Sequence, residues 1–206
     1  MKVLVACEFS GVVREAFNQR GHRATSADLL PTEIPGDHYQ GDVLEILDQG
    51  WDLMIAHPPC TYLSTVGNRW FKTDPTRYEK RLDAAIFWLQ LWHCDISKVC
   101  IENPQGYMNT HWKKPTHTIH PYYFGDPQLK RTCLWTRGLS HLEIDSNKHP
   151  RPEPMYICQG EKCMGKKIYY TEGIAGTGSQ ENRQKERSRT FPGIAAAMAE
   201  QWGDLK

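Results

Sequence analysis

Cys60 is the residue whose setting is best suited to chemistry. It ends the segment HPPC (residues 57–60), which follows the apolar run Asp52–Ala56. Each proline fixes its own backbone φ, so the two prolines stiffen the loop and hold the thiol at the edge of a cleft. A thiolate is a strong nucleophile once its pKa is lowered or a base assists it. A small buried hydrophobe is the alternative for any cysteine, and we favour it for Cys94 and Cys100, which lie inside apolar patterns.

A carboxylate is available to work with this cysteine. Glu102 is the last residue of the apolar run KVCIE (residues 98–102), and Asn103 follows it directly. If that strand lies beside the strand that precedes Cys60, Glu102 faces the same cleft. A carboxyl group that donates or shares a proton at neutral pH needs a raised pKa, which burial beside a bound aromatic ring can provide. We therefore predict a raised pKa for Glu102 and expect Asn103 to fix the loops by side-chain hydrogen bonds.

Polar residues and glycines follow the other predicted strands as well. Phe9-Ser10-Gly11 comes after the first strand, Asp28 ends the second, and Gly41-Asp42 follows the third. A carboxylate at the end of a second strand can accept hydrogen bonds from ribose hydroxyls, and a glycine lets a cofactor approach the backbone. Each feature alone is equally compatible with a solvated turn.

Strands alternate with helices along the first half of the chain. This alternation predicts an α/β fold with a doubly wound, mainly parallel sheet. In a long helix that begins at Asp74-Pro75, one apolar face is expected to pack on the sheet; it comprises Leu82, Ala85, Ile86, Leu89 and Trp92. The predicted strands are Lys2–Ala6, His22–Ala27, Asp52–Ala56, Lys98–Glu102 and Thr132–Thr136, and further helices are predicted at Gly11–Arg20, Val43–Leu47 and Pro192–Trp202.

Six short elements then form one ordered series. They are Phe9-Ser10-Gly11, Asp28, Gly41-Asp42, Pro59-Cys60, Glu102-Asn103 and GDPQLKR at residues 125–131. In this order they resemble the cytosine-5 DNA methyltransferase family, whose marks are a Phe-x-Gly turn, a Pro-Cys loop, a Glu-Asn strand end and a Gly-x-Pro-Gln segment followed by basic residues. Six elements in order are far more specific than any one of them.

The resemblance implies a Rossmann-like fold of the S-adenosylmethionine-dependent methyltransferase type, with S-adenosylmethionine as cofactor and DNA as partner. It implies that Cys60 attacks carbon 6 of cytosine, that Glu102 holds and protonates the ring nitrogen, and that carbon 5 takes the methyl group. The catalytic residues that it implies are Cys60, Glu102, Asn103, Lys130 and Arg131, with one of the two basic residues steadying the base or its phosphate. The cofactor-binding residues that it implies are Phe9, Ser10, Gly11, Asp28, Asp42 and Pro59.

The sequence departs from the family pattern at several positions. Val12 and Val13 follow Gly11 where a second glycine is usual, Thr61 replaces a glutamine after Cys60, and the two basic residues after Gln128 are adjacent. We expect a single methyltransferase-like domain over residues 1–206, with 140–190 a reduced irregular insertion in place of a target-recognition region. Recognition by a separate partner, and single-stranded DNA, RNA or a free nucleotide as substrate, stay open.

Composition limits the remaining function classes. The 25 Lys and Arg residues against 24 Asp and Glu give a net charge of +1, so contact with a polyanion requires a local patch. The N-terminus lacks signal-peptide features, and no run reaches the roughly 18 apolar residues of a membrane span. We expect a cytoplasmic protein with reduced thiols that does not contact membranes. No metal site is assigned, although zinc at Cys158 and Cys163 stays open.

Two rival functions are compatible with the sequence. A non-catalytic module could keep the fold and bind S-adenosylmethionine or nucleic acid, but the presence of both Cys60 and Glu102 argues against it. An amino-group methyltransferase would carry an Asp/Asn-Pro-Pro-Tyr loop, which resembles residues 57–60. His57 and Cys60 stand at the ends of that loop, where the acidic or amide residue and the aromatic residue would be needed.

Overall fold

A computed structural model describes residues 1–145, 148–161, 164–169 and 188–204. Seven strands form one sheet in the order β3-β2-β1-β4-β5-β7-β6. Strand β7 runs antiparallel to both of its neighbours, and the other pairs are parallel. The strands are β1 Lys2–Ala6, β2 Arg23–Asp28, β3 His38–Gln40, β4 Leu53–Ala56, β5 Lys98–Pro104, β6 His117–Ile119 and β7 Thr132–Arg137.

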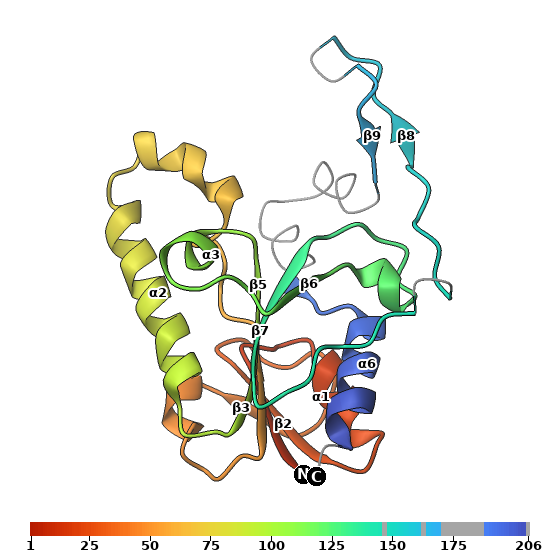
Figure 1. The fold of residues 1–206 in the computed structure, drawn as a ribbon. Coiled ribbons are helices and arrows are strands. Elements are labelled where there is room, and N and C mark those ends of the chain that lie inside the picture. Colours follow the sequence, from red (N-terminus) through yellow and green to blue (C-terminus); the bar gives the residue numbers. More distant parts are fainter. Residues whose placement is uncertain (146–147, 162–163, 170–187, 205–206) are drawn as a thin grey trace.

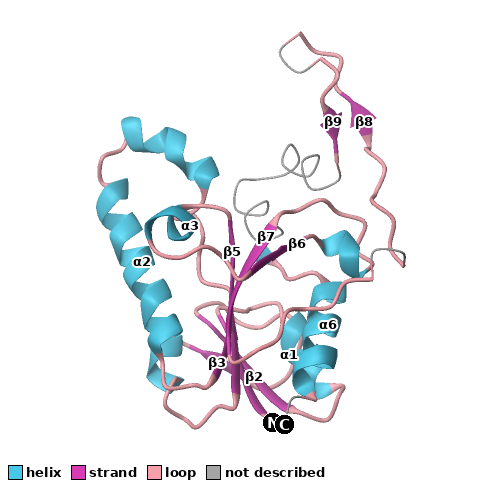
Figure 2. Ribbon diagram, in the orientation of Figure 1, coloured by secondary structure: helices cyan, strands magenta, loops and turns pink. Residues whose placement is uncertain are grey.

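Helices cover both faces of this sheet (Figures 1 and 2). Helices α1 (Val12–Asn18) and α6 (Pro192–Gly203) lie together on one face, and α2 (Arg77–His93) and α3 (Tyr107–His111) lie on the other. Three 3-10 helices complete the main body, namely η1 Val43–Ile46, η2 Thr65–Lys72 and η3 Pro121–Phe124.

The strand sequences explain the two layers of core. Successive side chains of a strand point to opposite faces. In β1, Val3 and Val5 join the cluster that includes α1 and α6, while Leu4 and Ala6 join the cluster that includes α2. All four are fully buried, which is why central strands covered on both faces form continuous apolar runs.

The chain order reverses between β1 and β4, which lie side by side in the sheet although β2 and β3 intervene in the sequence. Ligands of open α/β sheets bind at such a switch point, beyond the carboxyl ends of the strands. The fold is a doubly wound, mainly parallel α/β sheet, as the sequence predicts.

The predicted buried face of the long helix is wrong in part. Leu82 and Ile86 are 55% and 57% exposed. The helix instead packs through a neighbouring face, because two large indoles there remove more apolar surface from water than Leu82 and Ile86 would. The buried residues are Ala85, Trp88, Leu91 and Trp92.

A two-stranded hairpin projects from the main body near the top of Figure 1. Its strands are β8 (Tyr156–Ile157) and β9 (Lys167–Ile168). Cys158 is disulfide-bonded, so its sulfur is not available to zinc and the expectation of reduced thiols is wrong at this position. Cys163, like residues 170–187 of the predicted insertion 140–190, lies outside the described residues.

Within the described part of the chain, no helix combines the length and the apolar character needed to cross a bilayer.

Candidate active site

The predicted nucleophile and its partner acid follow neighbouring parallel strands. In the β4–β5 pair, Ala56 stands opposite Ile101. Glu102 is the next residue of β5, and Cys60 lies four residues beyond Ala56 on the following loop. Both therefore belong to the carboxyl edge of the sheet, beside the switch point.

The loop that carries Cys60 is tied to the sheet. Asn103 is 2% exposed, and its Nδ2 donates a 2.8 Å hydrogen bond to the carbonyl oxygen of Pro58. The carbonyl oxygen of Cys60 accepts hydrogen bonds from the backbone N–H groups of Leu63 and Ser64, at 3.1 and 2.9 Å. Cys60 itself is exposed. The side-chain hydrogen bond expected of Asn103 is thus present, and it fixes the loop two residues before the thiol.

Without a base beside it, Glu102 has a lowered pKa, and the raised pKa expected beside a bound aromatic base stays a prediction. Desolvation does act to raise the pKa of this carboxyl group, but hydrogen bonding to His57 and the nearby charge of Lys130 outweigh it and lower the pKa. The Nδ1 atom of His57 lies 3.4 Å from Oε2 of Glu102. The carboxyl group of Glu102 therefore favours its ionised form.

The two basic residues after Gln128 separate in space. Lys130 contributes to the electrostatic environment of Glu102, and its ammonium group lies 5.3 Å from the ring centre of Phe191. Arg131 is exposed and acts instead on His120, where desolvation and the charge of Arg131 lower the histidine pKa. Lys130, rather than Arg131, lies with the predicted catalytic residues.

The turn after β1 is built around an unpredicted carboxylate. Glu8 is 3% exposed, and its oxygens accept hydrogen bonds from the backbone N–H groups of Val13 and Arg14, at 2.7 and 3.3 Å. Ser10 also donates to Glu8. Glu8 therefore caps the N-terminus of α1 and favours it electrostatically.

Gly11 is required in this turn. Its φ is 75°, in the left-handed region, and a Cβ at this position would lie 2.8 Å from Nη2 of Arg14. The neighbouring predicted cofactor residues Phe9 and Ser10 are buried, whereas Pro59, on the other side of the switch point, is exposed.

Two further carboxylates stand close to one another at the ends of β2 and β3. Burial raises the pKa of the Cys7 thiol, and both Asp28 and Asp42 raise it further, so the three side chains share one region. Desolvation also raises the pKa of Asp28, although its Oδ1 accepts a 2.9 Å hydrogen bond from the backbone of Leu30. Asp42 accepts from the backbone N–H of Leu44 and caps η1.

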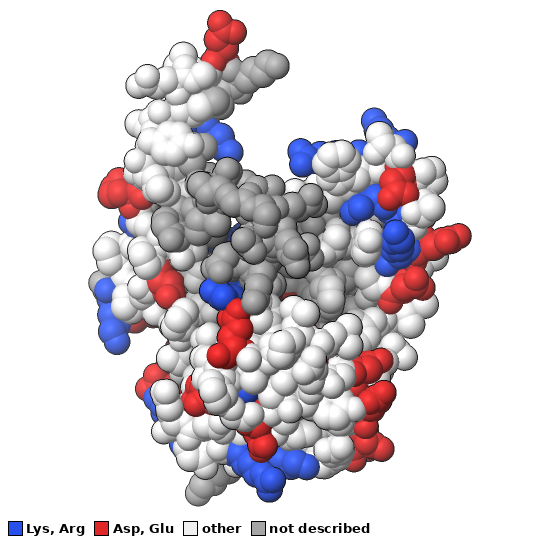
Figure 3. Space-filling view, turned by 180° about the vertical axis from the view of Figure 1, so that it is seen from behind, with Lys and Arg blue, Asp and Glu red and all other residues white. Residues whose placement is uncertain are grey.

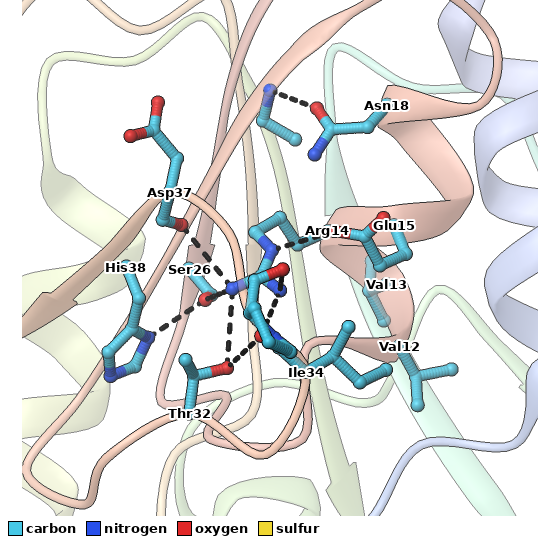
Figure 4. A network of polar contacts seen from close by, with 12 residues as sticks. Val12, Val13, Arg14, Glu15, Asn18, Ser26, Thr32, Ile34, Asp37 and His38 are labelled. Carbon is cyan, nitrogen blue, oxygen red and sulfur yellow. Dashed lines mark hydrogen bonds and ion pairs between the residues drawn. The ribbon is translucent and has the colours of Figure 1, made fainter.

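Arg14 holds the loop that follows β2 (Figure 4). This arginine is fully buried. Its guanidinium group donates to Oγ of Ser26 at 3.0 Å, to Oγ1 of Thr32 at 3.3 Å and to the carbonyl oxygen of Ile34. The loop beside Asp28 is thereby bound to helix α1.

The segment just before α6 crosses the same edge of the sheet. Arg189 forms a 2.8 Å ion pair with Glu33, and Oγ1 of Thr190 lies 3.5 Å from Nε2 of His57. The backbone N–H of Gly193 donates to the carboxylate of Asp126 at 2.8 Å. Residues far apart in the sequence thus meet around the predicted site.

Sequence reasoning did not assign site roles to His57, Glu8 or Arg14. His57 carried a usable signal, because it precedes the two prolines at a strand end. Glu8 also follows a strand directly. The sequence held no such signal for Arg14, because a lone arginine on a short helix is ordinarily solvated.

No protein-family model and no curated protein match this sequence. Among solved structures, the chain is similar to one titled as a DNA modification methyltransferase encoded within a prophage of E. coli, with TM-score 0.46 and 13% identity over 87% of this chain and 56% of that one. It is also similar to a mutant of Spodoptera frugiperda DNMT2, with TM-score 0.39 and 15% identity over 88% of this chain and 61% of that one. The chain therefore spans less than two thirds of either protein. Because both similarities are weak, the fold class rests on the strand order described above.

Proposed function

We propose that this protein transfers a methyl group from S-adenosylmethionine to carbon 5 of cytosine in DNA, through a covalent adduct with Cys60. One observation carries the proposal. An exposed cysteine and a carboxylate follow adjacent parallel strands at the switch point, and Asn103 ties the cysteine loop to the strand of the carboxylate.

The two residues complement each other chemically. The Cys60 thiolate attacks carbon 6 of the ring and forms an S–C6 bond, while the π electrons of the C5–C6 bond shift into the ring. Glu102 gives a proton to the ring nitrogen N3, which removes the charge that would oppose this shift. Carbon 5 then takes the methyl group, and loss of its proton and of the thiolate restores the ring.

The residues at the ends of β1, β2 and β3 fit a cationic nucleoside cofactor. In dinucleotide-binding sheets a pyrophosphate sits on the N-terminus of the first helix. Here the Glu8 carboxylate accepts hydrogen bonds from backbone N–H groups at that position, so a phosphate would be repelled. Asp28 and Asp42 add negative charge that favours a cation. S-adenosylmethionine, when bound, supplies the methyl group from its positively charged sulfur.

The segment after Cys60 supports a nucleic-acid substrate. Residues 61–81 hold five Lys and Arg against two Asp and Glu, in a chain whose net charge is only +1. Figure 3 shows Lys and Arg side chains gathered at the upper right, the end of the molecule formed by η2 and the start of α2. Such a cluster can neutralise phosphates.

Aromatic rings are interleaved with these cations. The guanidinium groups lie 4.8 Å from the ring centre of Trp70 for Arg69, 4.7 Å from that of Tyr62 for Arg77 and 3.7 Å from that of Phe71 for Arg81. Trp70 is 50% exposed. Exposed rings beside cations bind unpaired bases by stacking, so we expect single-stranded DNA to be accepted at least as well as duplex DNA.

Residues 140–190 replace a full target-recognition region in this proposal, and the chain acts as a single methyltransferase-like domain. Sequence selectivity is then low unless a separate partner supplies it.

The test is methyl transfer from labelled S-adenosylmethionine to single-stranded DNA, duplex DNA and RNA, followed by identification of the methylated nucleoside. We expect 5-methylcytosine from the wild type, none from Cys60→Ala, and normal levels from Cys94→Ala, a matched control whose thiol lies beyond the C-terminus of α2. A methyl group on an exocyclic amino group, or full activity of Cys60→Ala, would refute the proposal. Cofactor binding without any transfer would favour the non-catalytic module.

A further inference from the structure

His57 is held by contacts at both of its ring nitrogens and at its backbone N–H. Its side chain is 7% exposed. Nδ1 lies 3.4 Å from Oε2 of Glu102, and Nε2 lies 3.5 Å from Oγ1 of Thr190. Its backbone N–H donates a 2.9 Å hydrogen bond to the carbonyl oxygen of Ala6, so the histidine is fixed to β1 as well.

The position of His57 relative to the cysteine loop is equally constrained. Asn103 binds the carbonyl oxygen of the next residue, Pro58. The imidazole therefore cannot turn away from Glu102 without breaking contacts at both ring nitrogens. A ring held by both nitrogens has a defined proton position, which is what a proton carrier needs.

The charged groups around the pair are few. Among the described residues, Glu102 faces Nδ1 from β5, and Lys130 acts on Glu102 from the segment between β6 and β7. Arg189 is adjacent to Thr190 in sequence, but its guanidinium group pairs with Glu33. Of these groups, His57 is the one whose ring nitrogen contacts the carboxylate of Glu102 directly, and an imidazole can pass a proton to such a neighbour.

The proposed reaction needs a proton on Glu102, whereas His57 and Lys130 lower the pKa of Glu102 and keep this carboxyl group ionised. We propose that His57 is a positioning residue that stores the proton which Glu102 passes to the bound base. This inference rests on the proposed function.

The steps balance as follows. The imidazolium of His57 gives its Nδ1 proton to Oε2 of Glu102 when the base binds and excludes water. Glu102 passes this same proton from Oε2 to N3 as the thiolate attacks, so Glu102 is again a carboxylate and His57 is left neutral. On elimination N3 returns its proton to Glu102, and Glu102 returns one to His57, so no net proton is consumed by this pair.

The first test is the pH profile of adduct formation with DNA that carries 5-fluorocytosine. In His57→Asn, the amide keeps a hydrogen-bond donor near the position of Nδ1, but it has no nitrogen that takes up and releases a proton in this pH range. We expect the rate of His57→Asn to begin falling at a lower pH than the wild-type rate, because the variant has no imidazole to store the proton once Glu102 is ionised. At pH 8 the variant should be slower by about 100-fold, the size of a general-acid contribution, and at pH 5.5 the two rates should approach each other.

His93→Asn, at the exposed end of α2, is the matched control and should follow the wild type. A purely structural His57 would lower the rate by the same factor at every pH, and that result would overturn the inference. The absence of any adduct in the wild type would count against the proposed function instead.

A second measurement needs no turnover. Nitrogen-detected NMR of the histidine rings shows which ring nitrogen carries hydrogen. We expect the Nδ1–H resonance of His57 to move upfield in Glu102→Gln, because a neutral amide oxygen is a weaker acceptor than a carboxylate. An unchanged resonance would show that the two side chains are not coupled and would also overturn the inference.

Discussion

Asn103 shows how a single buried side chain positions the reactive loop. Its amide joins β5 to the carbonyl oxygen of Pro58, two residues before Cys60. Because Asn103 is 2% exposed, water cannot replace a lost partner at that carbonyl group. The position of the loop that carries the thiol thus depends on this buried amide.

We expect Asn103→Ala to lower the methyl-transfer rate by about 10- to 100-fold through misplacement of the thiol, and the free energy of unfolding by about 1–2 kcal/mol through loss of the buried hydrogen bond. Rate assays and urea unfolding check both values. Asn18→Ala is the matched control, because Asn18 binds the backbone of Ala24 at the opposite edge of the sheet. It should cost similar stability and leave the rate unchanged; equal losses of rate in both variants would argue against a positioning role.

The sequence alone predicted where Cys60, Glu102 and Asn103 stand, because each follows an apolar strand. It could not predict the ionisation of Glu102. Burial of a carboxyl group is visible in an apolar pattern, but the two opposing charges come from His57, in the loop after β4, and from Lys130, which is 28 residues away from Glu102 in the chain. Only the folded chain brings these three together.

At the scale of elements, the loop after β2 is held by contacts from outside itself. Arg14 of α1 donates hydrogen bonds to Oγ1 of Thr32 and to the carbonyl oxygen of Ile34 in this loop. Arg189, just before α6, forms an ion pair with Glu33 of the same loop. The predicted ribose carboxylate, Asp28, begins this loop. If Asp28 holds the cofactor as proposed, cofactor affinity will depend on helix α1 as well as on the strand ends.

Arg14→Lys should destabilise the protein by about 3 kcal/mol, because an ammonium group cannot satisfy the same set of buried acceptors. The affinity for S-adenosylmethionine should fall as well, since the loop beside Asp28 loses its anchor. Thermal unfolding and calorimetric titration measure the two effects. Arg23→Lys, an exposed site at the start of β2, is the control. A stable Arg14→Lys variant with normal affinity would show that the network is dispensable.

The element boundaries show what periodicity can and cannot specify. The strand Lys2–Ala6 was predicted with its observed bounds, because a fully buried strand is a short, continuous apolar run. In α2, several residues fit more than one apolar face, and the two tryptophans decided which face packs on the sheet. Strand β6 was not predicted, because its three residues, His117–Ile119, gain their strand conformation from pairing with β7.

The basic and aromatic segment 61–81 predicts a salt-dependent affinity for single strands. Arg77→Gln should weaken binding of a fluorescent oligonucleotide by about threefold to tenfold at low salt and reduce the slope of log affinity against log salt by about 1. Trp70→Ala should weaken binding with the slope unchanged, since stacking does not release counterions. Arg23→Gln is the control for charge. If Arg77→Gln and Arg23→Gln behaved alike, the segment would not be the binding surface.

At the scale of the whole molecule, the first strand and the last helix pack in the same hydrophobic cluster. Helix α6 packs against α1, and Gly203 near its end lies beside His22, whose Nδ1 is 3.5 Å from the N-terminal amine. The predicted domain of 206 residues thus has its last helix in the same core cluster as its first strand.

The sensitivity of the protein to acid is a property of the whole molecule, because it reflects the free energy of folding. Desolvation lowers the pKa of His117 to about 4, and the nearby His141 adds to the effect. Neither ring nitrogen of His117 has a hydrogen-bond partner among the described residues. The unfolded chain, with an ordinary histidine pKa of 6.5, therefore binds more protons than the folded chain between pH 6.5 and 4.

The free energy of unfolding should consequently fall as the pH drops through this window, by an amount on the order of 2 kcal/mol for this residue. His117→Phe should remove most of that part of the pH dependence, and His93→Phe should retain it. Urea unfolding at several pH values provides the comparison. Parallel pH curves for His117→Phe and the wild type would contradict the assignment.

The central claim is that Cys60 forms a bond to cytosine. Its most direct test is intact-mass analysis of the protein after incubation with S-adenosylmethionine and DNA containing 5-fluorocytosine, where fluorine prevents the final elimination. We predict a covalent protein–DNA species in the wild type and in Cys94→Ala, and none in Cys60→Ala. Methyl transfer to DNA by the wild type without a trapped species, or a trapped species that persists in Cys60→Ala, would contradict the claim.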